Sequence, residues 1–206
     1  MDHYKKYNKI EIDIFRNGEL IGYNYYFFKR KGDETIVTNQ IKFSVKVLGA
    51  TILQIEGYGV EKYLKDQLVS YNSKTLQNDK EKFVSLVFDK GENKFNIKGS
   101  SYSGKAPKNN IIGNWWSHKI LQADSQISPV SGSIKKQIVT FVGKEKIEQY
   151  GKVYNVDRFT LKSKDMNLPK DKRLDFNIWY EPESAQILRV SYSRMGNWEY
   201  RLKHFE

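Results

Sequence analysis

The sequence contains no cysteine, so disulfide frameworks, thiol nucleophiles and cysteine-ligated zinc or iron–sulfur centres are excluded. Histidine is scarce as well. His3, His118 and His204 are far apart in the chain and lack the paired spacing of common zinc sites. No phosphate-cradling glycine loop of the P-loop or dinucleotide type is present. We therefore expect neither a metal site nor a cofactor.

Long apolar runs are also missing. No stretch of about 18 apolar residues could form a transmembrane helix, and residues 1–9 lack the apolar core of a secretory signal. Two interpretations of the compartment follow. The chain is cytoplasmic if Met1 is its native start, and periplasmic or otherwise exported if Met1 stands where a signal peptide was removed. A strand pattern begins near Tyr7, which favours the exported interpretation.

Basic residues exceed acidic ones, 35 against 24 in 206 residues, which gives a net charge of +11. The lysines alternate with acidic residues along most of the strand patterns, and no dense basic block occurs. A solvated surface therefore explains the charge better than nucleic-acid binding does, and nucleic acid is not an expected partner. An anionic envelope surface is an expected partner instead, because its negative charge attracts a basic protein.

Apolar and polar residues alternate over most of the chain with a period of two, which is typical of half-buried β-strands. In the first strand pattern, Ile10, Ile12 and Ile14 are separated by acidic residues. Further strands are predicted at 20–29, 41–48, 51–64, 68–76, 83–89, 94–99, 134–142, 153–162, 174–180, 187–193 and 198–205. We expect about 12 strands in total.

Turn residues recur about every 8–12 positions, which predicts an antiparallel meander. Asn17-Gly18 fits a type I′ hairpin turn, because both central residues of that turn need positive φ. Gly57 and Gly59 fall inside one strand pattern, where glycines often mark bulges or bends. We therefore predict an all-β fold with one short helix, in which a strongly curved antiparallel meander sheet forms a half-barrel or open barrel.

The middle of the chain interrupts the strand pattern. Residues 99–110 are small and polar and predict a loop, residues 111–122 predict one short helix, and residues 124–132 are irregular. We interpret 99–132 as a lid-like segment of a single domain that spans residues 1–206, in preference to a boundary between two domains.

Two tryptophans lie in the predicted helix. Trp116 and Ile120 are four residues apart and share one helix face, whereas Trp115 points elsewhere. A short helix needs its apolar face packed, so we expect it across the open side of the sheet with Trp116 as a plug. Trp116 is then either a plain core residue or the wall of a ligand groove, and both interpretations predict that it is buried.

Aromatic residues are abundant, with 14 Tyr, 11 Phe and 4 Trp. A curved sheet with one short helix has little to cover its concave face, so these rings form either a solid core or the lining of a cavity. A cavity of this kind would bind a lipid or another apolar molecule. The candidate ligand-binding residues are Trp116, Trp115, Tyr25, Phe27, Phe43, Trp179 and Trp198.

No catalytic residue can be assigned from the sequence. Residues 99–104 are rich in serine but lack the Gly-x-Ser-x-Gly elbow of serine hydrolases. A hydrolase site near residues 111–124, using Ser117, His118 or Asp124, is one alternative function, although the spacing follows no recognised catalytic pattern. An interaction or structural protein of the envelope, acting through its basic surface, is another. A non-enzymatic binding protein is the preferred function.

The order of motifs resembles that of uncharacterised exported bacterial β-rich proteins, similar in style to the lipoprotein-carrier (Lol-type) half-barrels. The similar features are the hairpin at 15–22, the strand 41–48 running into a glycine, the segment Asn114-Trp115-Trp116-Ser117, and the strand 175–180. The resemblance implies a curved antiparallel sheet, an envelope location and no known catalytic residues. It matches Trp116 to the motif, while Trp115 departs from the pattern.

Overall fold

The computed structural model describes residues 4–206, so His3 lies outside the described residues. Fifteen strands make up most of the described residues. They are β1 (Lys9–Arg16), β2 (Glu19–Lys31), β3 (Glu34–Val47), β4 (Ala50–Leu64), β5 (Gln67–Gln77), β6 (Lys80–Asp89), β7 (Lys94–Gly99), β8 (Ser103–Pro107), β9 (Ile111–Ile112), β10 (Ser125–Ile127), β11 (Ile134–Gln149), β12 (Lys152–Ser163), β13 (Asp175–Glu181), β14 (Gln186–Ser193) and β15 (Asn197–Phe205). Two short 3₁₀-helices, η2 (His118–Leu121) and η3 (Lys170–Lys172), lie between strands.

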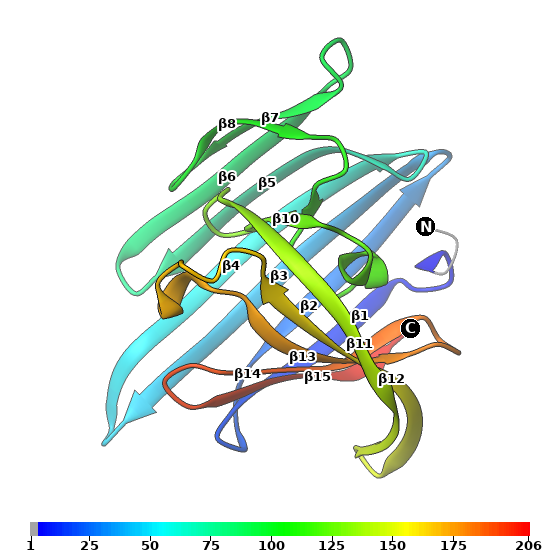
Figure 1. The fold of residues 1–206 in the computed structure, drawn as a ribbon. Helices are drawn as coiled ribbons and strands as arrows, with labels where there is room; N and C mark the ends of the chain where they lie inside the picture. Colours follow the sequence, from blue (N-terminus) through cyan, green and yellow to red (C-terminus); the bar gives the residue numbers. More distant parts are fainter. Residues whose placement is uncertain (1–3) are drawn as a thin grey trace.

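All fifteen strands form one sheet in the order β8-β7-β6-β5-β4-β3-β2-β1-β15-β14-β13-β12-β11-β10-β9. The sheet is two meanders joined through the first and last strands of the chain, because β1 and β15 pair antiparallel and bring the two ends of the chain together (Figure 1). Every neighbouring pair is antiparallel except β9 with β10. The predicted curved antiparallel sheet is confirmed, with three strands more than expected.

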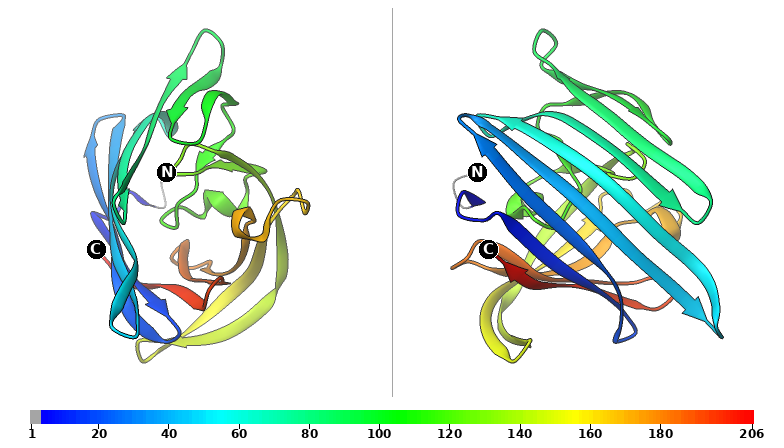
Figure 2. Two further views of the ribbon diagram at one scale, coloured as in Figure 1. Left: turned by 90° about the vertical axis from the view of Figure 1, so that its left-hand side faces the viewer. Right: turned by 180° about the vertical axis from the view of Figure 1, so that it is seen from behind.

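The sheet curls until the far ends of the two meanders touch. The backbone N–H of Ser101, after β7, donates to the carbonyl of Ser131, before β11, at 3.0 Å. A Cβ atom on Gly99 would lie 2.6 Å from the same carbonyl oxygen, so glycine permits this approach. Seen from the side, the strands form a wall around the middle of the chain (Figure 2).

Local sequence signals account for the turns and for the close approach of strands. Asn17 and Gly18 have φ of 52° and 83°, which confirms the type I′ turn between β1 and β2. Gly57 and Gly59 do not mark bulges, because the register shifts involving β4 lie at Val45/Lys46 on β3 and at Lys62/Tyr63. Instead these glycines leave room on the inner face of the sheet.

The middle segment, residues 99–132, differs from the prediction. Residues 99–110 include the strand β8, and residues 124–132 include β10. The short helix predicted within 111–122 is present but shorter than expected: β9 occupies 111–112, and helix is confined to the four residues of η2. Trp116 therefore precedes the helix and does not share a helix face with Ile120. Contacts with distant strands, rather than local propensity, hold this segment extended.

The hairpin of β11 and β12 is longer than predicted. The sequence predicts a strand that ends at residue 142, but Gly143 lies at a register shift, and β11 continues to Gln149. The hairpin tip reaches β1 and β15: the Tyr150 hydroxyl donates to Asp13 at 2.8 Å, and the Gln149 amide donates to the Leu202 carbonyl at 2.8 Å. A β-bulge bends a strand without ending its pairing, so β11 and β12 stay paired on both sides of Gly143.

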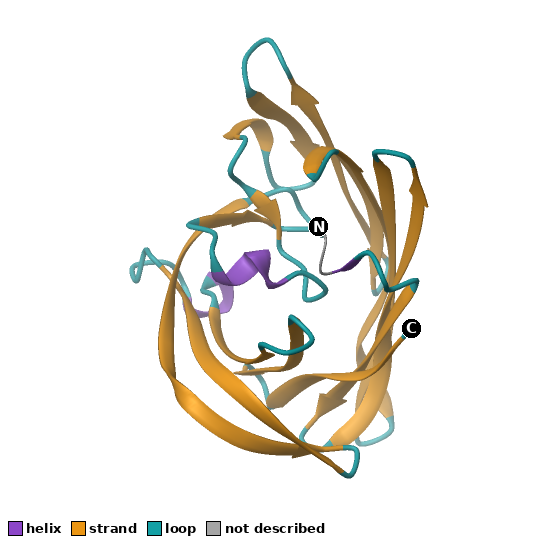
Figure 3. Ribbon diagram, turned by 90° about the vertical axis from the view of Figure 1, so that its right-hand side faces the viewer, coloured by secondary structure: helices purple, strands orange, loops and turns teal. Residues whose placement is uncertain are grey.

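The middle segment, including η2, lies inside the curve of the sheet (Figure 3). Trp116 is 2% exposed, as both interpretations of its role expected, and packs edge-on against Tyr4, Phe28 and Tyr63. The concave side is therefore neither an open groove nor a solid core, because residues 107–127 fill its centre and cavities remain beside them.

Candidate ligand-binding pocket

Four aromatic rings meet beside the middle segment. Trp115 packs edge-on against Phe176 of β13 with centroids 5.1 Å apart, and Phe176 packs against Tyr192 of β14 at 5.3 Å. Tyr200 of β15 lies 6.3 Å from Tyr192 and 6.4 Å from Trp115. Adjacent antiparallel strands place these side chains on one face, so the rings form a continuous aromatic surface.

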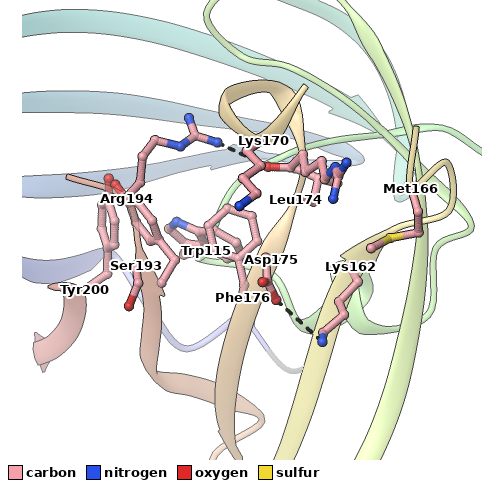
Figure 4. A pocket seen from close by; sticks show the side chains of 12 residues that line it. Trp115, Lys162, Met166, Lys170, Leu174, Asp175, Phe176, Ser193, Arg194 and Tyr200 are labelled. Atoms are coloured by element: carbon pink, nitrogen blue, oxygen red, sulfur yellow. Dashed lines mark hydrogen bonds and ion pairs between the residues drawn. The ribbon is translucent and has the colours of Figure 1, made fainter. Parts of the chain in front are cut away.

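This surface is the floor of a pocket of about 390 Å³. The segment between β12 and β13, which contains η3, forms one rim, and the turn after β14 forms another (Figure 4). The lining residues are Trp115, Lys162, Met166, Lys170, Arg173, Leu174, Asp175, Phe176, Tyr192, Ser193, Arg194 and Tyr200. The volume lies within the range of small-molecule sites, about 300–1,000 Å³.

The rim of the pocket is strongly basic. Lys162, Lys170, Arg173 and Arg194 line it, and Asp175 is the one acidic residue among the lining residues. The Lys162 ammonium lies 3.8 Å from the Asp175 carboxylate, which leaves three cations in excess. The Arg194 guanidinium donates to the Arg173 backbone carbonyl at 3.2 Å, a contact that fixes its position without neutralising its charge (Figure 4).

A further cation, Lys135, lies just outside the rim. Burial and then repulsion by Arg194 lower the pKa of Lys135 below its ordinary value. Its ammonium group donates to the Lys172 carbonyl at 2.8 Å. Because several cations disfavour one another here, an anion that entered the pocket would relieve their repulsion.

The pocket combines a binding surface for apolar groups with a site for negative charge. Its lining contains no histidine, and its one serine, Ser193, donates to the Asn197 side chain at 2.8 Å. Among the described residues, no group of three or more metal-ligating side chains is found. The arrangement suits the binding of a molecule with an apolar part and an anionic head.

Three of the predicted ligand residues belong to one chain of ring contacts. Trp115 lines the pocket directly. Trp198 lies beside the floor, stacked on its cross-strand partner Tyr192 at 5.7 Å, and Phe43 packs edge-on against Trp198 at 5.5 Å. Trp198 and Phe43 therefore support the floor but do not line the pocket.

Trp116, Tyr25, Phe27 and Trp179 lie elsewhere. Trp116 is enclosed in the interior core. Tyr25 and Phe27 point to the strand face opposite the buried Tyr26 and Phe28, where Lys9 lies over both rings. Strand alternation places them outside the concave face expected from the sequence.

Trp179 likewise points away from its buried neighbour Ile178. It lies between the guanidinium groups of Arg158 and Arg189, and its indole N–H donates to Glu145 of the β11–β12 hairpin. The side chain is covered by this hairpin and not by the middle segment.

Of the residues of the hydrolase alternative, Ser117 and His118 both contact the Tyr4 hydroxyl, whereas Asp124 contacts Gln137. Ser117 caps η2, and its hydroxyl accepts the Lys119 N–H at 3.4 Å. The His118 ring nitrogen Nδ1 lies 2.6 Å from the Tyr4 hydroxyl. Asp124 accepts the Gln137 backbone N–H through its own backbone carbonyl at 2.8 Å.

Sequence reasoning missed the basic rim and three of the floor residues. Phe176, Tyr192 and Tyr200 lie in predicted strands. Their alternation with polar residues along each strand is the signal that could have identified them as residues of the inner face. The rim residues come from the loop after β12 and the turn after β14, and no local pattern links two such distant segments.

Residues 13–203 match the family model described as "Domain of unknown function (DUF6134)", and the chain belongs to that family. A β-barrel-like protein of the domain of unknown function DUF1849 from Brucella abortus is similar in structure, with a TM-score of 0.62, 10% identity and 96% of each chain covered. No curated protein matches. The expected link to an uncharacterised β-rich family is confirmed, whereas the likeness to Lol-type carriers is not found in these matches.

Two further structures show weaker similarity. An exported protein from Bacteroides fragilis, described as putative and as having a YmcC-like fold, has a TM-score of 0.38 and 12% identity, with 96% of this chain and 94% of that chain covered. A DUF1329 family protein from Desulfovibrio piger has a TM-score of 0.29 and 11% identity, with 100% of this chain and 88% of that chain covered.

Among the described residues, no helix has the length and apolarity needed to cross a bilayer.

Proposed function

We propose that this member of the DUF6134 family is a non-enzymatic binding protein for an amphiphilic anion, such as a fatty acid or an anionic lipid. The observation that carries the proposal is the aromatic floor of Trp115, Phe176, Tyr192 and Tyr200 beside a rim with three unneutralised cations. An apolar chain buries its surface on the rings, and the anionic head pairs with the rim.

The two halves of the pocket call for different ligand features. The rings provide a broad apolar surface, which selects a ligand by the area and shape of its apolar part and not by a particular hydrogen bond. Arg173 and Arg194 present planar guanidinium groups, which match a carboxylate or phosphate better than an ammonium group does. A neutral lipid would leave these cations without a partner, so the anionic head distinguishes the proposed ligand from other apolar molecules.

The experiment is a binding titration of oleate against oleyl alcohol, followed by the change in the protein's tryptophan fluorescence, to which Trp115 in the pocket contributes. Oleate is expected to bind about tenfold more tightly than the alcohol, because only the carboxylate pairs with the rim. Equal affinity of the two compounds, or binding of neither, would overturn the proposal.

Two variants distinguish binding of the anion at the rim from attraction to the protein's net charge. Arg173→Gln with Arg194→Gln is expected to weaken oleate binding about tenfold while leaving the binding of oleyl alcohol unchanged. Lys94→Gln with Lys98→Gln is the matched control, because it also removes two positive charges and these exposed lysines on β7 do not line the pocket. A loss of oleate affinity equal to that of the arginine variant would assign the effect to net charge instead of to the rim.

Export from the cytoplasm is part of the proposal, because a carrier of amphiphiles serves the envelope. It rests on the resemblance of the motif order to exported β-rich proteins. Fractionation of cells that express the gene from its own start codon tests it. Recovery of the protein in the cytoplasmic fraction alone would contradict export without affecting the binding proposal.

A further inference from the structure

A second cavity, of about 170 Å³, lies on the inner side of β2–β5, beside the middle segment. Trp115 and Tyr200 line both this inner cavity and the basic pocket, so the two spaces share a wall of two rings. At about 30 Å³ per water molecule, the inner cavity has the volume of five or six waters, which suits a small organic molecule.

The inner cavity has a single charged group in its lining, the carboxylate of Glu61 on β4. Glu61 is 2% exposed, and none of the ion pairs among the described residues involves it. Its oxygen Oε1 accepts the Asn114 amide and the Trp116 indole N–H, both at 3.0 Å, and Oε2 accepts the Tyr63 hydroxyl. A carboxylate can accept about four hydrogen bonds, so these three leave Oε2 with capacity for another donor.

Aromatic rings form the walls around this carboxylate. Tyr26, Tyr71, Trp115 and Tyr200 all line the cavity. The hydroxyl of Tyr26 accepts the Asn24 amide at 3.0 Å and the Trp115 backbone N–H at 3.5 Å, which holds the phenol in place. Aromatic faces attract cations, and the attraction grows when the site is shielded from water.

Small residues on β4 keep the space open. A Cβ atom on Gly57 would lie 2.9 Å from Ile41 Cγ2 and 3.1 Å from the Thr75 hydroxyl, and all three residues line the cavity. On the same face, a Cβ atom on Gly59 would lie 3.0 Å from the Tyr71 hydroxyl oxygen. The glycines expected from the sequence to bend the sheet therefore make room for the cavity and for one of its aromatic walls.

We propose that the inner cavity binds a small organic ammonium ion, with Glu61 as the counter-charge and the tyrosine and tryptophan rings as the walls. The ligand carries positive charge because the one charge in the lining is negative. This site is opposite in charge to the basic pocket, and it does not depend on the function proposed for that pocket.

The proposal predicts a particular pH dependence. Burial raises the pKa of Glu61 to about 7, with the three hydrogen-bond donors opposing the rise. The other titratable groups around the cavity are tyrosines, and burial raises the pKa of Tyr26, Tyr63, Tyr71 and Tyr200 above the ordinary value. These four are neutral near pH 7, and Tyr58 is half-exposed at the cavity edge. His118 contacts Tyr4 and does not line the cavity.

The test is calorimetric titration with choline and with its uncharged carbon isostere, in which a carbon atom replaces the nitrogen. Choline keeps its charge at every pH, so a pH effect on its binding reports the protein. We expect choline to bind at least about tenfold more tightly than the isostere at pH 8. Below pH 7 its affinity should fall by up to about tenfold per pH unit, because protonation removes the counter-charge. Equal binding of the two compounds, or no binding of choline, would overturn the proposal.

A pair of variants completes the test. Glu61→Gln is expected to lower the choline affinity at least about tenfold and to remove its pH dependence. Glu56→Gln is the control, because Glu56 lies on the same strand, points outward and pairs with Lys42 at 3.0 Å. If Glu61→Gln does not fold, the comparison of choline with its isostere in the unaltered protein still decides the matter. Choline binding that is unchanged in folded Glu61→Gln would contradict the assignment of Glu61.

Discussion

Glu61 shows how one buried residue organises the interior. A carboxylate removed from water is costly unless hydrogen bonds compensate for the lost solvation. Here Tyr63 is two residues away on β4, whereas Asn114 and Trp116 come from the middle of the chain. The carboxylate therefore ties the middle segment to the sheet, and the segment cannot leave without exposing an unsatisfied charge.

The titration of Glu61 predicts how stability varies with pH. Its folded pKa of about 7 lies above the value of 4.5 for an unperturbed glutamate, so the folded state holds the proton more tightly. The resulting stabilisation is complete below about pH 4.5 and is lost as the pH rises through 7. The shift corresponds to about 3 kcal/mol in the free energy of unfolding. Urea denaturation of the wild type and Glu61→Gln between these pH values measures it.

The difference between the two proteins isolates Glu61, because all other titrations cancel. The wild type should lose stability relative to Glu61→Gln on going from pH 5 to pH 8. A difference that is constant with pH, or that changes in the opposite direction, would show that Glu61 is ionised in the folded state at both values.

Trp116 gives a second prediction for a single residue. Trp116→Ala removes the ring contacts with Tyr4, Phe28 and Tyr63 and should cost about 3–5 kcal/mol in the free energy of unfolding. Trp116→Phe keeps much of this packing and loses the indole hydrogen bond to Glu61, so we expect about 1–3 kcal/mol. Thermal or urea denaturation compares the two. Equal costs would mean that ring packing contributes little.

At the scale of elements, the strands could be predicted and the middle segment could not. Alternation of apolar and polar residues is local, so it located strands such as Leu20–Lys29 within a few residues of their ends. The segment around Trp115 and Trp116 has helix-like spacing, but its hydrogen bonds go to Glu61, which lies more than fifty residues earlier in the chain. Such long-range contacts leave no pattern in the local sequence.

The β11–β12 hairpin carries a prediction for a single element. Gln149 donates to the backbone carbonyls of Leu188 and Leu202, and its side-chain oxygen accepts the Arg189 guanidinium at 3.1 Å. Gln149→Ala removes these three hydrogen bonds and should cost about 1–3 kcal/mol. Hydrogen exchange should also become faster at the hairpin tip. Lys146→Ala, at an exposed position of the same strand, is the control and should change neither quantity.

For the molecule as a whole, the curved sheet follows from the sequence but the pocket does not. Turn signals such as Asn17-Gly18 specify which strands neighbour one another, and neighbouring pairs alone generate the two meanders. The basic pocket needs the middle segment, the loop after β12 and the turn after β14 to meet. Their meeting depends on how far the sheet curls, which no single strand encodes.

The net charge of +11 gives a prediction for the whole molecule. Attraction of its surface to anionic membranes should fall steeply as salt rises from about 0.1 to 1 M, because exposed charges are screened. Binding of oleate in the pocket should weaken far less, since the rings contribute much of the affinity. Vesicle sedimentation and oleate titration over the same salt range compare the two. Parallel loss of both would indicate that oleate binds the surface.

The most direct test of the central claim is a crystal structure of the protein with oleate. The account predicts the carboxylate between Arg173 and Arg194 and the acyl chain over Phe176 and Tyr192. Oleate seated instead on the outer face, near Tyr25 and Phe27 or near Trp179, would contradict it, as would a basic pocket that stays empty of oleate at saturating concentration.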